Sequence, residues 1–282
     1  MKSEFSFVGK TAWMATMHEK DEIILPTLKN GLGLKLAVVP NFNSDALGTF
    51  SGEIERPGNQ LETALLKIDS AQKILPQEFI FLSSEGAFFP FPQMPLLTQN
   101  LELLILKNVS ENFIIKGFCT EIGFPFWETV ISNPSELVPY LKHRDFHSEG
   151  LILKTLFEDK WLVYKDFNST DEVNLAFLQI QNLNKSATLS PDLRAHRNEN
   201  RRKNIIKAAE DLVKNAFSVC PSCKTPGFSV TKSIKGLPCG WCQMPTTLPK
   251  GEVLECQSCN HQEIRMLETK MADPKYCTFC NP

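Results

Sequence analysis

Eight cysteines in the C-terminal quarter of this 282-residue sequence have the type and spacing to bind metal ions. They form four pairs whose partners are separated by two residues, and the gaps between successive pairs are 15, 13 and 17 residues. A two-residue spacer lets both thiolates of a tight turn face one cation, and two such turns complete a tetrahedral site. The spacing therefore predicts two zinc ions, each bound by four cysteines. The predicted ligands are Cys220, Cys223, Cys239, Cys242, Cys256, Cys259, Cys277 and Cys280.

A site closed by four thiolates leaves no position for water, so we expect both zinc ions to be structural rather than catalytic. Four disulfides are an alternative, but they require an oxidising compartment that nothing in the sequence indicates. Iron–sulfur clusters favour a tighter run of cysteines. The ninth cysteine, Cys119, lies in an apolar stretch and is expected to be a buried thiol.

The sequence leaves open which cysteine pairs share an ion. Two sequential sites would join the first pair with the second and the third pair with the fourth. A nested arrangement would join the first pair with the fourth and the second with the third, with residues 251–255 and 262–267 as strands. We weigh these two arrangements equally and place an interleaved arrangement below both.

A second group of polar side chains falls in expected loops and at element ends. Carboxylates that converge with hydroxyls and cations suit Mg²⁺ and a phosphorylated ligand, so this group predicts a hydrolytic site. Each residue taken alone also suits a structural role, such as a helix cap or a solvated surface charge. The candidate catalytic residues are Asp45, Glu53, Glu85 and Glu102. The candidate substrate-binding residues are Thr49, Ser51, Arg56, Lys67, Ser84 and Arg201.

Alternating strands and helices must position these groups, and they predict an α/β fold over residues 1–190. Apolar residues recur at helical spacing over 60–75, with Asn59 and Glu62 placed as a capping box. A strand is expected at 78–82. Residues 83–95 are expected to be irregular, because three prolines and a glycine interrupt them.

The chain beyond residue 190 predicts two further parts. Ser190 and Pro191 resemble a helix start, and asparagines at 198, 200 and 204 are expected to interrupt the helix that follows. Residues 191–217 thus read as a basic helical linker, and residues 218–282 as a small double zinc-ribbon-like module. That module is short and poor in aliphatic residues, so we expect it to need metal to fold.

The formal net charge of −2 hides an asymmetry along the chain. Residues 1–193 carry 16 Lys and Arg against 24 Asp and Glu, whereas residues 194–282 carry 14 against 8. The basic segment 194–207 is expected either to pack on the acidic first part, which we favour, or to bind phosphate or nucleic acid. The module itself is nearly neutral in charge and has few aromatic residues, which is a weak pattern for nucleic-acid binding.

Targeting signals are not evident in the sequence. The start of the chain lacks the continuous apolar stretch of a secretory signal, and no run of about 18 apolar residues is present. We therefore expect a cytoplasmic protein with no membrane partner and reduced cysteines.

Three phrases together resemble a bacterial family of unknown function that joins one larger domain to a cysteine-rich end. They are residues 43–56 followed by 83–92, residues 192–205, and the cysteine-rich tail. The chain departs from that family where it has Asn43 instead of Asp, at residues 89–92 instead of Gly-Pro-His-Pro, and at residues 198–201 instead of Asn-Pro-Thr-Arg. The resemblance brings no assigned reaction, and the departures imply an altered activity if those positions carry chemistry in relatives.

A second resemblance concerns the order of elements around the carboxylates. An acidic helix over 62–71, a strand over 79–88 and an acidic strand over 101–107 are together similar to nucleoside-triphosphate pyrophosphatases of the inosine-triphosphatase type. In those enzymes an acidic helix and a carboxylate at a strand end line the nucleotide groove. This resemblance implies a metal-dependent hydrolase of a nucleotide or another phosphorylated substrate. The alternative is a binding module for nucleic acid or protein, without catalysis.

Overall fold

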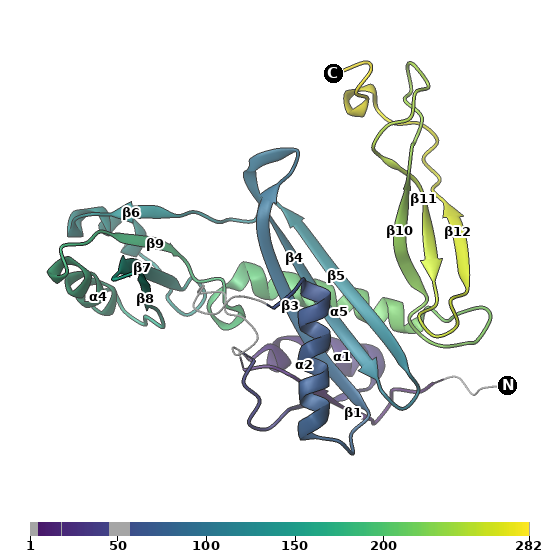
Figure 1. The fold of residues 1–282 in the computed structure, drawn as a ribbon, viewed down its shortest axis with the longest axis horizontal. Coiled ribbons are helices and arrows are strands. Elements are labelled where there is room, and N and C mark those ends of the chain that lie inside the picture. The colour runs from purple at the N-terminus through teal and green to yellow at the C-terminus, as the bar shows by residue number, and fades with distance from the viewer. Residues whose placement is uncertain (1–4, 18, 45–56, 282) are drawn as a thin grey trace. The chain divides into compact units, whose positions relative to one another are not determined.

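The structure is a computed structural model that describes residues 5–17, 19–44 and 57–281 (Figure 1). The contacts divide the chain into two compact units. The larger unit contains residues 7–107 and 116–213, and the smaller unit, here called the cysteine unit, contains residues 108–115 and 214–281 with Phe5 and Ser6. Helices and sheets together make a mixed α/β protein, as the sequence predicts. The three-part division into 1–190, 191–217 and 218–282 stays a prediction.

A five-stranded mixed sheet forms the first half of the larger unit (Figure 1). Its strands lie in the order β2-β1-β3-β4-β5, and β1 runs parallel to both β2 and β3. Parallel neighbours need crossover connections, and the helices α1 and α2 lie in the two connections. The elements are β1 (Thr11–Met14), α1 (Lys20–Leu32), β2 (Lys35–Val38), α2 (Gln60–Ile74), β3 (Ile80–Phe91), β4 (Met94–Asn108) and β5 (Phe113–Ile122).

Helix α2 confirms the predicted helix and its capping box. The Asn59 side chain accepts a hydrogen bond from the Glu62 backbone N–H at 3.0 Å, and Glu62 Oε2 accepts one from the Asn59 N–H at 3.0 Å. These two bonds satisfy amide groups that the first turn of a helix leaves without partners. The buried residues of α2 recur every three or four positions and form the face that packs on β3.

The proline-rich segment was predicted wrongly, because it is regular. Residues 83–91 continue β3, and β4 begins at Met94 after a two-residue turn. Strand β1 pairs with β3 at Phe81 and Leu82, so the later part of β3 has β4 as its neighbour in the described chain. A strand with one open side tolerates proline, since the missing N–H can face away from the ladder. This explains how Pro90 lies within a strand.

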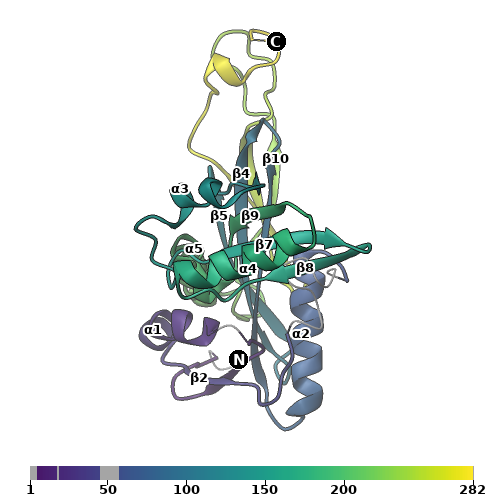
Figure 2. The same cartoon turned by 90° about the vertical axis from the view of Figure 1, so that its left-hand side faces the viewer.

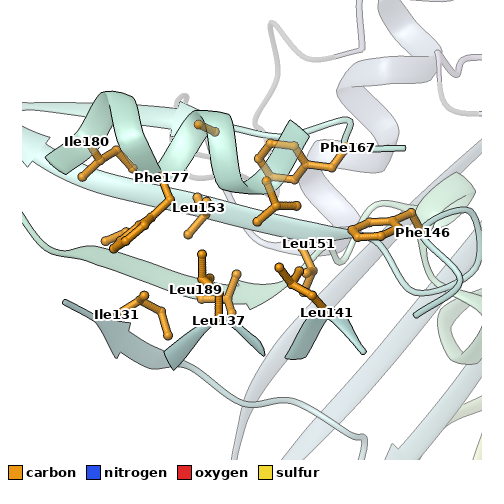
Figure 3. Close-up of a cluster of buried hydrophobic side chains, with 13 residues drawn as sticks. Ile131, Leu137, Leu141, Phe146, Leu151, Leu153, Phe167, Phe177, Ile180 and Leu189 are labelled. Carbon is orange, nitrogen blue, oxygen red and sulfur yellow. The ribbon is translucent and has the colours of Figure 1, made fainter. Parts of the chain in front are cut away.

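The second half of the larger unit is a four-stranded antiparallel sheet of order β6-β9-β7-β8 (Figure 2). Helix α4 lies along one face, and side chains from α4 and the sheet form the hydrophobic core shown in Figure 3, in which Phe177 and Ile180 lie near Leu153. Strands β7 and β8 pair antiparallel as a hairpin. The elements are β6 (Thr129–Ile131), α3 (Val138–Leu141), β7 (Leu151–Phe157), β8 (Lys160–Tyr164), α4 (Thr170–Asn182) and β9 (Ala187–Pro191).

The segment after residue 190 differs from its prediction. Ser190 and Pro191 end strand β9 rather than start a helix, and α5 runs unbroken over Glu199–Phe217. The Asn198 side chain accepts a hydrogen bond from the Arg201 backbone N–H at 3.0 Å, so it caps the start of α5. Asparagine weakens a helix in its interior but stabilises it at its start. Asn198 comes just before the first residue of α5, so its effect is stabilising.

The cysteine unit is built on a three-stranded antiparallel sheet of order β10-β11-β12. Its strands are β10 (Ser229–Lys235), β11 (Pro249–Glu255) and β12 (Gln262–Met266). The last two match the predicted strands, whereas β10 was not predicted. Across both units, none of the described helices is long and apolar enough to cross a membrane.

Candidate functional site

Five charged side chains from five elements are buried together in the larger unit. Their residues expose between 0 and 7% of their surface. Burying charges is costly, and unusual charged environments concentrate at functional sites. We call this set the buried charged cluster and treat it as the candidate site. It consists of Lys20 on α1, Lys67 on α2, Glu85 on β3, Glu102 on β4 and Arg201 on α5.

Lys67 and Glu85 form one ion pair of the cluster. Lys67 lies on the buried face of α2, where it adjoins the apolar stripe of that helix. The Gln60 side chain donates to the backbone carbonyls of Glu85 at 3.2 Å and Leu101 at 3.0 Å. These bonds connect the first turn of α2 to β3 and β4, so they fix the position of Lys67 relative to Glu85.

Glu102 and Arg201 form the second ion pair. Arg201 donates through Nε to Glu102 Oε1 at 2.8 Å and through Nη2 to Oε2 at 3.4 Å. Asn100 Nδ2 donates to Glu102 Oε1 at 3.0 Å. The Asn204 side chain in turn donates to Asn100 Oδ1 at 2.8 Å. Arg201 Nη1 donates to the Leu193 carbonyl at 2.5 Å. The guanidinium is therefore held in one orientation by partners on two sides.

Gly86 lets the second ion pair approach the backbone of β3. A Cβ atom at Gly86 would lie 2.5 Å from Arg201 Nη2 and 2.5 Å from Glu102 Oε1. Phe88, two residues further along the strand, lies with its ring 5.7 Å from the Arg201 guanidinium carbon. A side chain at position 86 would thus displace the pair, which explains the glycine at this place.

Lys20 completes the cluster but has no carboxylate partner among the described residues. Its ammonium donates to the Ser84 carbonyl at 3.1 Å. Burial lowers the pKa of Lys20, and the positive charges of Arg201 and Lys67 lower it by more than the negative charges of Glu85 and Glu102 raise it. Together these effects bring the pKa to about 7. Lys20 is therefore a buried amine that gains or loses its proton near neutral pH.

The structure brings together four of the residues singled out from sequence, namely Lys67, Glu85, Glu102 and Arg201. Ser84 adjoins them through its backbone carbonyl rather than through its hydroxyl. The catalytic and substrate-binding roles of these residues stay predictions. The remaining candidates lie outside the described residues: Asp45, Thr49, Ser51, Glu53 and Arg56.

Sequence reasoning missed Lys20. A lone lysine at a helix start usually extends into solvent. Two signals were nevertheless present: Lys20 follows soon after a strand that is parallel to both its neighbours, and ligand sites in α/β sheets gather beyond the carboxyl ends of such strands. For Arg201, the buried stripe of α5 extends one turn before Ile205 and takes in Asn204 and Arg201.

The cysteine unit holds two groups of four thiols in metal-binding geometry. Within each group all four sulfur atoms lie within 4.8 Å of one another. The shortest approaches are 3.5 and 3.7 Å in the first group and 3.6 and 3.8 Å in the second. A tetrahedron with metal–sulfur bonds of about 2.3 Å has sulfur–sulfur edges of about 3.8 Å, so the thiols fit a tetrahedral ion. The groups are Cys220, Cys223, Cys256 and Cys259, and Cys239, Cys242, Cys277 and Cys280.

All four cysteine pairs share one turn geometry. In each, the residue four positions after the first cysteine donates its backbone N–H to the carbonyl of that cysteine, at 2.9 to 3.1 Å. The donors are Lys224, Gln243, Asn260 and Asn281. This turn places the two thiols of a pair on the same side, as a shared cation requires.

The sulfur groups reveal an interleaved arrangement, so neither of the two favoured pairings is correct. The first cysteine pair joins the third and the second joins the fourth. The antiparallel sheet is the physical reason, because one strand lies between each two successive pairs and reverses the chain direction. Alternate pairs consequently arrive at the same end of the sheet.

The basic segment before and within α5 is largely used inside the larger unit. Arg194 is 8% exposed and binds Asp192 at 2.6 Å and Asp166 at 2.7 Å. Arg201 binds Glu102, as described above. For these two arginines the structure confirms the expectation that the segment packs on acidic residues. Cys119 is also buried as predicted, and burial raises the pKa of its thiol.

A search of curated proteins found none that matches the chain. A family model described as a domain of unknown function, DUF6671, matches residues 75–282. The matched region includes Glu85, Glu102 and Arg201 of the cluster, as well as both groups of cysteines. Because the match spans well over half of the sequence, the chain belongs to the DUF6671 family.

Proposed function

We propose that the larger unit hydrolyses a phosphorylated ligand, with nucleotides as the leading class, at the buried charged cluster and with the help of Mg²⁺. The observation that carries this proposal is the composition of the cluster. Three cations and two carboxylates are buried together, so its described part has one positive charge in excess when all five groups are ionised. An anionic ligand balances that charge.

The geometry supports distinct roles for the two ion pairs. Arg201 is fixed by Glu102 and the Leu193 carbonyl, so its guanidinium is preorganised to orient a phosphoryl group. Lys67 has Glu85 as its ion-pair partner, and an ammonium on a flexible stem can turn to a phosphate oxygen. In this scheme the Glu85 carboxylate accepts a proton from an attacking water.

Magnesium fits the carboxylates among the candidate residues. Mg²⁺ is usually bound by one or two carboxylates together with substrate phosphates. The sequence analysis gives Asp45 and Glu53, which lie outside the described residues, as candidates for this role. When bound, the ion would neutralise charge on the phosphoryl oxygens. The similarity to nucleoside-triphosphate pyrophosphatases, which carry an acidic helix beside a strand-end carboxylate, points to the same ligand class.

A hydrolysis screen tests the proposal. Full-length, metal-loaded protein with added Mg²⁺ would be assayed against nucleoside triphosphates, other nucleotides and generic phosphoesters. We expect turnover, and we expect Glu85→Gln and Lys67→Met each to reduce kcat/KM by about 100-fold or more, as loss of a general base or charge-stabilising group does.

The control for this screen is Lys73→Met, which removes an exposed lysine from the same helix. It should leave turnover unchanged. Turnover that survives both cluster substitutions would place the reaction elsewhere, and absence of turnover with every substrate would leave the chain a binding protein.

We further propose that both groups of cysteines bind Zn²⁺ and that the cysteine unit is a zinc-ribbon-like module. Four thiolates at tetrahedral spacing with no other ligand suit zinc, and such closed sites are structural. Elemental analysis of protein purified without added metal should find two zinc ions per chain. A chain that contains iron, or S–S crosslinks instead of metal, would contradict this assignment.

A second candidate function is protein binding by the cysteine unit. The observation in its favour is a group of exposed aromatic side chains beside the second group of thiols: Trp241, Tyr276 and Phe279 are 77, 50 and 63% exposed. Aromatic anchors of this kind are enriched at protein interfaces. Nucleic acid is less favoured, because Arg194 and Arg201 are occupied inside the larger unit. Trp241→Ala should abolish capture of such a protein partner and leave hydrolysis unchanged.

A further inference from the structure

We propose that Lys20 takes up one proton when the buried charged cluster binds a tetrahedral oxyanion. The inference rests on the anion site of the proposed function, but it does not require that the ligand be hydrolysed. It assigns to Lys20 the role of neutralising one negative charge of the ligand.

The two ion pairs of the cluster leave Lys20 without a carboxylate partner among the described residues. Lys67 binds Glu85 and Arg201 binds Glu102, so each carboxylate of the cluster already has a cation. Lys20 is 6% exposed, and among the described residues its ammonium has the Ser84 carbonyl as its hydrogen-bond partner. Burying a cation without a counter-ion costs free energy. The Lys20 amine therefore either loses its proton or keeps it when an anion binds beside it.

Four charged side chains of the described residues act on Lys20, each from a different element. They are Lys67 from α2, Glu85 from β3, Glu102 from β4 and Arg201 from α5. These four groups sum to zero charge, so burial and the two nearby cations decide the state of the amine. The pKa of Lys20 is accordingly lowered to about 7, which leaves the free protein with a mostly neutral amine above that pH.

An anion reverses this balance. A negative charge beside the amine favours its protonated form and raises its pKa. By linkage, the bound state then holds one more proton than the free state at pH values above 7, and the affinity for the anion falls by about tenfold per pH unit. Below pH 7 the amine is already charged, so the affinity should depend little on the protonation of Lys20.

Sulfate is the probe for the test, because it is a tetrahedral dianion that does not titrate between pH 7 and 10. Calorimetric titrations of the full-length, metal-loaded protein without added Mg²⁺ would be run at pH 7.5, 8.5 and 9.5. At each pH, two buffers of different ionisation enthalpy report the number of protons taken up. We expect close to one proton per sulfate at pH 8.5 and a fall of about tenfold in affinity per pH unit.

Three variants assign the proton to Lys20. Lys20→Arg keeps a permanent charge, so it should bind sulfate without proton uptake and with an affinity that does not change with pH. Lys20→Met should bind weakly, also without proton uptake. Lys73→Met, on the exposed part of α2, should behave as the unaltered chain does. The unaltered protein alone already decides the proton count if a variant fails to fold.

The outcomes separate this inference from the proposed function. Sulfate binding with no proton uptake, or with proton uptake that persists in Lys20→Met, overturns the role of Lys20 and leaves the anion site intact. Failure of the unaltered chain to bind sulfate and inorganic phosphate at every pH overturns both. Proton-linked binding without any hydrolysis in the substrate screen supports the inference and removes the hydrolase.

Discussion

The backbone of β3 at Gly86 lies against the Glu102–Arg201 pair. A methyl group at position 86 would push this pair away from the strand. We expect Gly86→Ala to lower the free energy of unfolding by about 1–3 kcal/mol, as overpacking of a buried site does. The added carbon would lie within 2.5 Å of atoms of both side chains, and neither can retreat without losing the other. Equilibrium denaturation would measure the loss, and an unchanged midpoint would show that the pair has room to move.

Lys20 should make the stability of the larger unit depend on pH. Its pKa is about 7 in the folded protein and close to its ordinary value of 10.5 when unfolded, so the unfolded chain binds more protons between these values. The free energy of unfolding therefore gains a contribution that rises with pH in this window, by up to about 1.4 kcal/mol per unit.

Comparison of denaturation curves at pH 7.5, 8.5 and 9.5 isolates that contribution. Lys20→Met should show a smaller rise in stability with pH than the unaltered chain, because the amine that titrates has gone. Lys73→Met, which removes an exposed amine, should keep the full rise. Parallel curves for the unaltered chain and Lys20→Met would mean that Lys20 is not charged differently in the two states.

Single residues were predictable from sequence where their type was unusual for their place. Glu85 and Glu102 stand beside apolar strand residues, and Lys67 adjoins an apolar helical stripe. Lys20 could not be found in this way, because the feature that defines it is burial by four other elements. Burial by distant segments is a property of tertiary packing that local periodicity does not contain.

Strand direction in the cysteine unit decides which thiols meet. Each gap between cysteine pairs contains one strand, and β10, β11 and β12 alternate in direction. Alternate pairs must therefore meet, and the arrangement could have been predicted from the spacing had β10 been recognised. Residues 229–235 were passed over because their exposed, mixed pattern lacks a regular alternation of apolar side chains.

Double substitutions distinguish the interleaved arrangement from the others by metal content. Cys220→Ser with Cys256→Ser alters one site twice and should leave one metal ion per chain. Cys220→Ser with Cys239→Ser alters both sites and should leave none. Sequential sites would give the reverse result. Nested sites would leave no ion in either of these double variants and one ion in Cys220→Ser with Cys277→Ser, which the interleaved arrangement leaves with none. Elemental analysis of the purified variants provides the count.

The hairpin of β3 and β4 shows the limit of composition as a guide to elements. Prolines within a segment argue against a strand that is paired on both sides, but they are compatible with a strand that is open on one side. Whether a side is open depends on where β1 ends, and that strand is far away in sequence. The same three prolines therefore allowed either outcome, and tertiary context decided for a strand.

At the scale of the whole molecule, the two units differ in what stabilises them. The larger unit has extensive hydrophobic cores, one of which contains thirteen buried residues. A small hydrophobic cluster in the described part of the cysteine unit consists of Cys220, Phe228 and Cys256, with Cys223 and Leu254 against it. Three of these five side chains belong to a candidate metal site. If that site holds an ion as proposed, removal of the ion should remove most of what orders that unit.

Hydrogen exchange before and after chelation would measure this difference. Chelation should abolish the protection of backbone amides in β10, β11 and β12, whereas the amides of α2, β3 and β7 should stay protected. Protection that persists in the three strands after loss of both ions would show that the sheet is stable by itself. Loss of protection throughout would show that the larger unit depends on the metal as well.

The interleaved thiols also set an order of events while the chain is being made. When Cys242 has just left the ribosome, the first two cysteine pairs are exposed, whereas the third pair begins 14 residues later and is still inside the exit tunnel. Those four thiols can capture an ion together, in a partnership that the finished fold does not use. Correct loading then requires that the ion exchange ligands once Cys256 and Cys259 appear. A growing chain in abundant metal therefore risks a kinetic trap, and slow exchange rather than weak affinity would limit its maturation.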